Sequence, residues 1–281
     1  MQLDLRPSPI AGRWYEGQPK ALAESIDNYL DKAQLPKLDG EILAVIAPHA
    51  GHMYSGAVAG HAFAALRGQA PSLVAVISPM HQPYPQPLIT SSHDAYVTPL
   101  GEILIDKDAV AQLSTTLKSE LGLGLSPVPR DPEHALEIEL PFLQRALKSN
   151  FKLLPVMVRA QEPHILKALG NALTEVLKDK NFALVASTDL SHFYDQETAQ
   201  KLDREMLRQI ESFSPEGVLE AEKKGTGFAC GRGAVAAVLW ASRALGADTV
   251  KLLNYATSGD VTRDYASVVG YGAAAILKSN P

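Results

Sequence analysis

The chain of 281 residues contains one cysteine, Cys230, so no disulfide can form within it. No apolar run approaches the ~20 residues that a membrane-spanning helix needs. Residues 1–6 also lack the apolar core of a signal peptide, so we expect a cytoplasmic protein without membrane contact. Lysine and arginine number 26 against 31 aspartates and glutamates, which gives a net charge of −5. Because no basic cluster stands out, we expect no nucleic-acid-binding surface.

Several short catalytic and nucleotide-binding motifs are also missing. The sequence has no Walker A loop, no HExxH helix, no pair of CxxC sequences and no GxSxG elbow. The segment GTGFACGRG lacks the third glycine of a dinucleotide-binding fingerprint and does not clearly follow a strand. The sequence therefore carries none of the common signatures of nucleotide-binding proteins, zinc proteases or serine hydrolases.

The chain does have the composition and patterning of a globular α/β protein. Hydrophobic residues make up 46% of it and charged residues 20%, which leaves enough apolar surface to build a core. Apolar runs predict strands at residues 41–47, 72–78, 151–158, 182–187, 250–255 and 266–274. Helical patterns occur at residues 55–67, 106–120, 133–148, 163–177, 198–212, 215–223 and 230–245, and short extended pieces within the proline-rich stretch 83–101. We expect a mixed sheet flanked by helices on both faces, in a single domain over residues 1–281, because no linker divides the chain.

Three of the predicted strands end in residues that bind metals. His49 follows the strand at 41–47, and His81 follows the strand at 72–78. The strand at 182–187 continues into VASTDLSHF, which supplies Asp189 and His192. Ligands of open α/β sheets bind beyond the carboxyl ends of the strands, so parallel neighbouring strands would bring these side chains into one crevice. Because imidazoles bind iron, copper and zinc, the pattern predicts a transition-metal site.

Cys230 opens the predicted helix at residues 230–245, within GTGFACGRG. The N–H groups and the dipole at a helix N-terminus stabilise a thiolate, and Arg232 lies two residues further on. Such a thiolate can bind a metal or act as a nucleophile. The alternative is that Cys230 is a small hydrophobic residue of the core.

His134 lies in DPEHALEIELPF, where Asp131 has the character of a helix N-cap and Pro132 that of a first helical residue. We expect the helix that follows to break or kink at Pro141. His134 and Glu137 then share one face of it. This spacing fits an imidazole held by a carboxylate, and equally a solvated first turn. Surface or helix-packing positions are expected for the other histidines, His52, His61, His93 and His164.

The motifs PHAGHMYSG, SPMH, YVTPLGEI, EHALEIELPFL, STDLSHF and CGRG resemble, in order and spacing, the motif series of the Memo family. The resemblance runs from about Arg6 to Ala274. The fold of this family is similar to that of the class III, LigB-like extradiol dioxygenases, which cleave aromatic rings with non-haem Fe(II). The resemblance therefore implies a LigB-like mixed sheet flanked by helices.

The resemblance also implies a ligand set of His49, His81 and Cys230, with the cysteine standing where the dioxygenases have a glutamate. The implied metal is Fe(II) or copper, with zinc as a further candidate. A thiolate in place of a carboxylate favours Cu(I) or zinc and is itself oxidisable. His52 departs from the family pattern, which commonly has tyrosine there, and this departure could add a ligand or alter the polarity of the pocket. Catalytic or pocket roles are implied for His192, His134 and Asp189.

Three functions are consistent with these observations. The first is a metal-dependent redox or dioxygenase-like protein that acts on an unknown small molecule. The second is a peptide- or phosphopeptide-binding module, because animal members of the family bind phosphotyrosine peptides and Arg232 lies where it can hold an anion. The third is hydrolysis by a Cys230 nucleophile that His192 or His81 activates. Microbial members are grouped with AMMECR-type and radical-SAM proteins, which the resemblance implies as partners.

One distance decides whether the implied ligand set exists. A separation of more than ~8 Å between Cys230 and both His49 and His81 would exclude it, because metal–ligand bonds are only ~2 Å long.

Overall fold

The computed structural model describes residues 3–279, so the ends of the expected domain, residues 1–2 and 280–281, lie outside the described part. Within it, the central sheet has four parallel strands in the order β2 (Glu41–Ala47), β9 (Phe182–Ser187), β3 (Leu73–Pro79) and β8 (Lys152–Val158). Ala47 pairs with Ser187, and Ile77 pairs with Ala186. The carboxyl ends of β2, β9 and β3 therefore lie level at one edge of the sheet.

Further strands extend this sheet on both sides. Next to β2 lies the antiparallel strand β12 (Val268–Lys278), which also pairs with β11 (Thr249–Thr257) and β10 (His192–Tyr194). Beyond β8 lie β4 (Leu88–Ser91), which is antiparallel to it, and β7 (Ser126–Val128). The sheet is thus mixed, with a parallel centre, as the sequence predicts.

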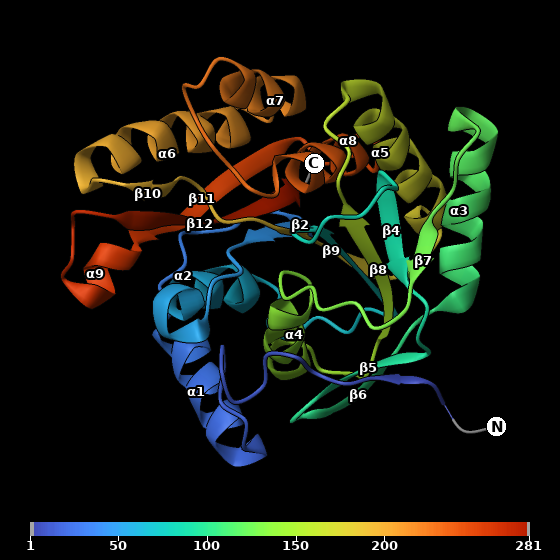
Figure 1. Cartoon of the computed structure of the whole chain (residues 1–281), viewed down its shortest axis with the longest axis horizontal. Helices are drawn as coiled ribbons and strands as arrows, with labels where there is room; N and C mark the ends of the chain where they lie inside the picture. The colour runs from blue at the N-terminus through green and yellow to red at the C-terminus, as the bar shows by residue number, and fades with distance from the viewer. Residues whose placement is uncertain (1–2, 280–281) are drawn as a thin grey trace.

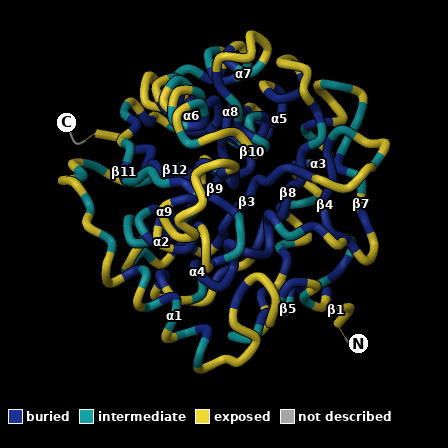
Figure 2. Tube along the Cα trace, turned by 60° about the vertical axis from the view of Figure 1, so that its left-hand side comes forward, coloured by how far each residue is buried: buried dark blue, intermediate teal, exposed yellow. Residues whose placement is uncertain are grey.

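Helices cover both faces of the sheet, which explains why its central strands are apolar throughout. One face packs against α3 (Lys107–Leu121), α5 (Pro163–Leu177), α6 (Gln196–Glu211), α7 (Pro215–Lys223) and α8 (Arg232–Ala244). The other face packs against α1 (Pro19–Lys32), α2 (His52–Ala65) and α4 (Leu140–Ala146) (Figure 1). Figure 2 shows the resulting buried centre around β3, β8 and β9, with exposed loops outside it. The predicted single-domain α/β fold is confirmed for the described residues.

A second, small sheet holds the start of the chain beside the main sheet, with the residue after β6, Ile105, bridged to Leu153 near the amino end of β8. It consists of β1 (Leu5–Arg6), β5 (Ala95–Thr98) and β6 (Gly101–Leu104). Leu5 pairs with Ala95, about ninety positions away in the sequence. The sequence patterns did not predict β1 or its pairing with β5, although Arg6 proves important for the candidate site.

The predicted helix over residues 133–148 is wrong in its first half. Residues 131–136 form no helix, and a short 3-10 turn, Glu137–Glu139, leads into α4. Pro141 lies in the first turn of α4, where a backbone N–H has no hydrogen-bond partner within the helix. The proline therefore starts this helix instead of breaking it. Asp131 and Pro132 therefore do not cap a helix. The acidic side chains of this segment turn into the protein, as described below.

Two other helices also differ from the sequence prediction. Helix α2 begins at His52 rather than at Ser55. Helix α1 was missed, although its buried residues Leu22, Ile26 and Leu30 follow the spacing of four that marks one helix face.

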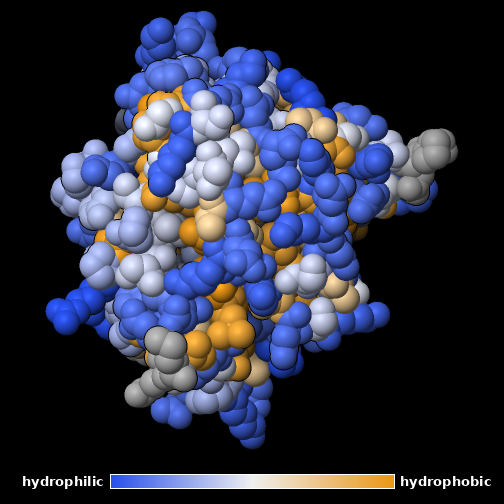
Figure 3. Space-filling model, turned by 90° about the vertical axis from the view of Figure 1, so that its right-hand side faces the viewer, coloured by the Kyte–Doolittle hydropathy of each residue, from blue (hydrophilic) through white to orange (hydrophobic). Residues whose placement is uncertain are grey.

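Among the described residues, no helix combines the length and apolar character needed to cross a membrane. The side of the molecule at the right of Figure 1 is mostly hydrophilic, with smaller hydrophobic patches between the hydrophilic residues (Figure 3).

Candidate metal centre

The ends of β2, β9 and β3 bring metal-binding side chains together as the sequence predicts. His49 lies two residues beyond β2, and His81 lies two residues beyond β3. The centroids of their rings are 5.3 Å apart. Because β9 lies between β2 and β3, Asp189 enters the same space, and its Oδ2 lies 4.0 Å from Nε2 of His49.

His134 joins the two strand-end histidines. One ring nitrogen each from His49, His81 and His134 lies within 4.8 Å of the others. The ring of His134 stacks on that of His81, with centroids 4.8 Å apart. The resemblance gave His134 a catalytic or pocket role, whereas its distance is that of a potential ligand. A donor set of three imidazoles is therefore an alternative to the set that includes Cys230.

Cys230 lies directly against His49. Its Sγ is 3.1 Å from Nε2 of His49, well within the limit that decides whether the ligand set can exist. The turn before α8 places it, because the N–H of Gly231 donates to Oγ1 of Thr188 and the N–H of Asp189 donates to Sγ. A Cβ at position 231 would lie 2.2 Å from the carbonyl oxygen of Ser187, so only glycine allows this close approach.

The observed separation of Cys230 and His49 suits a shared metal ion. Nitrogen and sulfur ligands at ~2.1 Å and ~2.3 Å from one ion would be ~3.1 Å apart at a right angle and ~3.6 Å apart at a tetrahedral angle. The 3.1 Å between Sγ and Nε2 matches the first value. Two imidazoles and a thiolate are also a donor set that iron, copper and zinc accept. The contact of Cys230 with His49 is therefore compatible with one shared ion, whereas the side chains whose ligand atoms all lie within 4.8 Å of one another, among the described residues, are the three histidines.

Glu133, which the sequence reasoning missed, holds two of the three histidines. Its Oε1 accepts from Nδ1 of His81 at 2.9 Å and lies 3.2 Å from Nδ1 of His134. Its Oε2 accepts from the backbone N–H of His81 at 2.5 Å. Imidazoles held through Nδ1 turn Nε2 toward the centre, which is how carboxylates orient metal-binding histidines.

Two residues that follow or end β9 hold His49. Its Nδ1 bonds Oγ of Ser187 at 2.8 Å. Asp189, for which the resemblance implies a catalytic or pocket role, accepts from the backbone N–H of His49 at 2.8 Å. His134 and Glu137, which the helical spacing would have allowed to pair, do not do so, because Glu133 lies beside His134 and Glu137 bonds Arg6. The different partners of His134 and Glu137 follow from the irregular backbone of the 131–136 segment.

A buried ion network supports the segment that carries Glu133. The guanidinium of Arg6 donates to Asp131 through Nε at 2.8 Å and to Glu137 at 2.5 Å. It also donates to the carbonyl oxygen of Glu133 at 2.7 Å. Tyr15 and Ser8 donate to the other oxygen of Glu137. The signal for this network was visible in the sequence as several acids within a short, otherwise apolar segment.

Burial keeps most of the cluster neutral in the metal-free protein. It lowers the pKa of His49 well below its ordinary value and that of His134 to about 4. Neutral imidazoles are the form that binds metals. Burial opposes protonation of His81 as well, but the hydrogen bond to Glu133 and its charge outweigh it, and the pKa of His81 is raised. Burial also raises the pKa of Asp189 to about 7.

The thiol of Cys230 is neutral in the metal-free protein, contrary to the thiolate expected from its place before a helix. Burial raises its pKa, and the nearby charge of Asp189 raises it further. These effects outweigh the hydrogen bonds from the backbone N–H groups of Asp189 and Gly231. The side chain is therefore poorly suited to act alone as a nucleophile, whereas a bound metal cation would favour its ionised form.

We expect Cys230 in metal-free protein to react slowly with iodoacetamide at pH 7, because the reactive thiolate is scarce. Mass spectrometry of the adduct over time would measure the rate. Protein unfolded in urea is the control, since its thiol has an ordinary pKa of about 8.5 and should react faster. A rate in folded protein equal to that of the unfolded control would contradict the raised pKa, and a faster rate would show a stabilised thiolate and favour the nucleophile hypothesis.

His192 lies at the start of β10, beside the cluster. Its Nδ1–H donates to the carbonyl oxygen of Leu190 at 2.8 Å, which leaves Nε2 with a free lone pair. Burial lowers the pKa of His192, so the ring is a neutral proton acceptor. The next residue, Phe193, has a φ of 64° and is 75% exposed. This backbone conformation directs the two neighbouring rings differently, with Phe193 outward.

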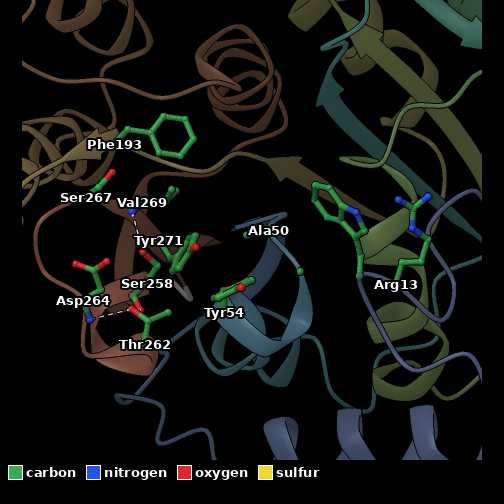
Figure 4. Close-up of a pocket in the computed structure, with 12 residues that line it drawn as sticks. Arg13, Ala50, Tyr54, Phe193, Ser258, Thr262, Asp264, Ser267, Val269 and Tyr271 are labelled. Carbon is green, nitrogen blue, oxygen red and sulfur yellow. Dashed lines mark hydrogen bonds between the residues drawn. The ribbon is translucent and has the colours of Figure 1, made fainter.

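A pocket of about 410 Å³ opens next to the cluster. Trp14 lines it and also packs on His134, with ring centroids 4.2 Å apart. Figure 4 shows Tyr54, Tyr271 and Ala50 in the middle of the pocket, with Arg13 and Asp264 at opposite sides. The remaining residues that line it are Gly51, Phe193, Ser258, Thr262, Ser267 and Val269. The lining is rich in aromatic side chains, as a pocket for a small organic molecule requires.

Two residues from the sequence reasoning lie away from the cluster. Arg232 forms an ion pair with Glu222 at 3.1 Å and lines a different pocket with acidic neighbours. It is therefore a poor candidate for holding an anion near the cluster. His52 packs against Phe142, and its Nε2 bonds the carbonyl oxygen of Ile138. His52 thus adds neither a ligand nor a polar group to the pocket lining.

Comparisons with known proteins establish the family. Residues 6–275 match the family model described as "Memo-like protein". The chain belongs to the Memo-like family. A MEMO1 family protein of Methanothermobacter thermautotrophicus is 35% identical over 277 residues, which cover 95% of this chain and 98% of the relative. One of Nitrosopumilus maritimus is 32% identical over 274 residues, covering 96% and 98%. One of Methanopyrus kandleri is 33% identical over 279 residues, covering 95% and 97%.

Proposed function

We propose that this Memo-like protein binds Fe(II) or copper, with zinc as a further candidate, at His49, His81 and Cys230. We further propose that it is a redox or dioxygenase-like protein whose substrate is a small molecule. The observation that carries the proposal is the contact of 3.1 Å between Sγ of Cys230 and Nε2 of His49, beside the imidazoles of His81 and His134. Among residues 3–279, the three histidines form the only group of three or more metal-binding side chains whose ligand atoms lie within 4.8 Å of one another, and Cys230 contacts this group through His49.

Each residue of the site has a definite task in this proposal. The metal, when bound, supplies a redox-active centre and polarises oxygen atoms of the substrate. Glu133 and Ser187 keep the imidazoles of His81 and His49 oriented. His192 accepts or returns a proton at Nε2, because its Nδ1–H is engaged by Leu190.

The neighbouring pocket supports a substrate with a planar, largely apolar body. Tyr54, Tyr271 and Trp14 offer aromatic faces, and Arg13 offers a positive charge at one side. Trp14 joins this pocket to the cluster through its contact with His134. Phe193, the neighbour of His192 in the chain, lines the same pocket.

Anaerobic titration of metal-free protein with Fe(II) and with Cu(I) tests the metal proposal. We expect one ion to bind per chain, with affinity that rises with pH because the thiol and the imidazolium of His81 must lose protons. Cys230→Ser and His81→Ala should weaken binding by more than the ~10–100-fold that loss of an outer partner costs. His134→Ala distinguishes the two donor sets. Its loss of metal affinity should be as large as in Cys230→Ser and His81→Ala only if His134 is a ligand.

His164→Ala is the control, since this histidine is exposed in the first turn of α5. It should bind metal as the unchanged protein does. Negligible uptake by the unchanged protein, or equal affinity in all the variants, would refute the proposed site.

The alternative is a peptide- or phosphopeptide-binding module on the same fold. Arg13, which lines the pocket, favours an anionic ligand there, whereas Arg232 is engaged by Glu222. Binding of a phosphotyrosine peptide by metal-free protein, weakened by Arg13→Ala and unaffected by Arg232→Ala, would support this alternative. Absence of binding would leave the metal-dependent function as the explanation of the pocket.

A further inference from the structure

Glu139 is a buried acid that neither the ligand set nor the pocket uses. It ends the turn Glu137–Glu139, and its side chain is inaccessible to solvent. Its Oε1 lies 2.6 Å from Oγ of Ser187. Its Oε2 has no hydrogen-bond partner among the described residues. An ionised carboxylate in this position would be strongly unfavourable, because only one of its two oxygens is hydrogen-bonded.

The hydrogen bonds around Ser187 reveal which atoms carry protons. Oγ of Ser187 has three partners: the carbonyl oxygen of Ala135 at 2.7 Å, Oε1 of Glu139 at 2.6 Å and Nδ1 of His49 at 2.8 Å. A hydroxyl has one hydrogen and two lone pairs, so it donates once and accepts twice. The carbonyl oxygen can only accept, and it therefore receives the hydroxyl hydrogen. Glu139 and His49 must then both donate to Ser187.

The single hydrogen and two lone pairs of the Ser187 hydroxyl have two consequences for its neighbours. Glu139 must carry a proton on Oε1, and His49 must carry its proton on Nδ1. With Glu139 ionised, two acceptors would compete for the single hydrogen of Ser187, and one buried acceptor would stay unpaired. Burial raises the pKa of Glu139 well above its ordinary value, and the charge of Asp189 adds to this, in agreement with the count.

We propose that Glu139 is a positioning residue: as a neutral carboxylic acid it donates to Ser187, which fixes Ser187 as the acceptor for His49 and turns the lone pair of Nε2 toward Cys230. The contact of 3.1 Å between Nε2 and Sγ is then a hydrogen bond from the neutral thiol. Cys230, His49, Ser187 and Glu139 thus form one hydrogen-bonded chain from the cluster into the core. The importance of this chain for metal binding rests on the proposed function, whereas its proton positions do not.

The first test uses metal-free protein near neutral pH. A difference infrared spectrum between the unchanged protein and Glu139→Gln should show the carbonyl band of one protonated carboxylic acid, lost in the variant. Asp189 is present in both samples and cancels. NMR of ¹⁵N-labelled imidazole should show His49 protonated at Nδ1 alone. Absence of the acid band, or His49 protonated at Nε2, would overturn the proposal.

The second test compares two replacements of Glu139. In Glu139→Gln the new side-chain amide can still donate to Ser187, so this variant should keep the single tautomer of His49 and bind metal within ~3-fold of the unchanged protein. Glu139→Met has similar volume but no donor, so the hydroxyl of Ser187 is free to turn. We expect mixed tautomers of His49 and metal affinity weakened by ~10–100-fold, the usual effect of losing an outer hydrogen-bond partner.

Ser187→Ala provides the same information if Glu139→Met does not fold. It removes the acceptor of His49 and should reproduce the mixed tautomers and the weaker metal binding. If Glu139→Met and Ser187→Ala both leave the imidazole signals of His49 unchanged, Glu139 is not a positioning residue. If the unchanged protein shows the expected signals but takes up no metal, the proposed function fails and the proton positions stand.

Discussion

Arg6→Met should lower the free energy of unfolding by about 3–5 kcal/mol, the cost of leaving buried charges without their partner. Arg6 is 1% exposed and bridges Asp131 and Glu137, whose side chains are inaccessible. Methionine fills most of the space but leaves both carboxylates unpaired. Urea denaturation followed by circular dichroism would measure the change at pH 7.

Arg208→Met is the matched control for this experiment. Arg208 also forms a close ion pair, with Glu205 at 2.8 Å, but its side chain is 63% exposed. Surface pairs of this kind contribute about 0–1 kcal/mol, so the control should change stability little. Similar losses in the two variants would show that Arg6 does not hold the segment that carries Glu133.

Glu133→Gln should both destabilise the metal-free protein and weaken metal binding. Burial alone would raise the pKa of Glu133, but hydrogen bonds and the charge of His81 lower it from 4.5 to about 2. This difference corresponds to about 3 kcal/mol at pH values above 4.5. Glutamine keeps the shape of the side chain and loses the charge. Metal affinity should fall by ~10–100-fold, because His81 and His134 lose the carboxylate that orients them.

The pH dependence of the free energy of unfolding tests the ion pair between Glu133 and His81. The contribution of Glu133 is present above its unfolded value of 4.5 and is lost as the pH falls toward about 2. The contribution of His81 is present below its unfolded value of 6.5 and is lost as the pH rises through its raised pKa. The difference in free energy of unfolding between the unchanged protein and Glu133→Gln should therefore be largest between pH 4.5 and 6.5.

Glu205→Gln is the control for Glu133→Gln. The pKa of Glu205 is also lowered to about 2, by hydrogen bonds from Arg208 and Gln209, but the side chain lies at the surface. Solvent screens its charge, so we expect a much smaller change of stability than in Glu133→Gln. A difference between unchanged protein and Glu133→Gln that does not vary with pH would contradict the ion pair with His81.

Sequence patterns predicted the frame of the site because that frame is built from local features. The runs at 41–47 and 182–187 are apolar throughout, and both are strands with the predicted bounds. Polar residues that interrupt the chain directly after such strands must lie at the edge of the sheet. This explains why the pattern of strands is sufficient to place His49, His81 and Asp189 at one edge of the sheet.

The segment from Asp131 to Glu139 shows where sequence patterns stop being sufficient. Its spacing of acids and apolar residues resembles an amphipathic helix with a charged outer face. In the structure Glu133, Glu137 and Glu139 are all buried. Each acid turns inward because it contacts a specific partner there. Glu133 contacts His81, and Glu137 contacts Arg6. Glu139 contacts Ser187. Those partners lie 48 to 131 positions away in the chain.

The sequence by itself determined the α/β architecture, the family and the strand ends that carry His49 and His81. The architecture and the strand ends follow from local hydrophobic periodicity, which reports which residues are buried, and the family follows from the order and spacing of its motifs. Only the tertiary structure decided that Cys230 touches His49, that Glu133 holds two histidines and that Glu139 must keep its proton. Such relations depend on contacts between distant segments, where the burial of a polar group and the identity of its partner are set together.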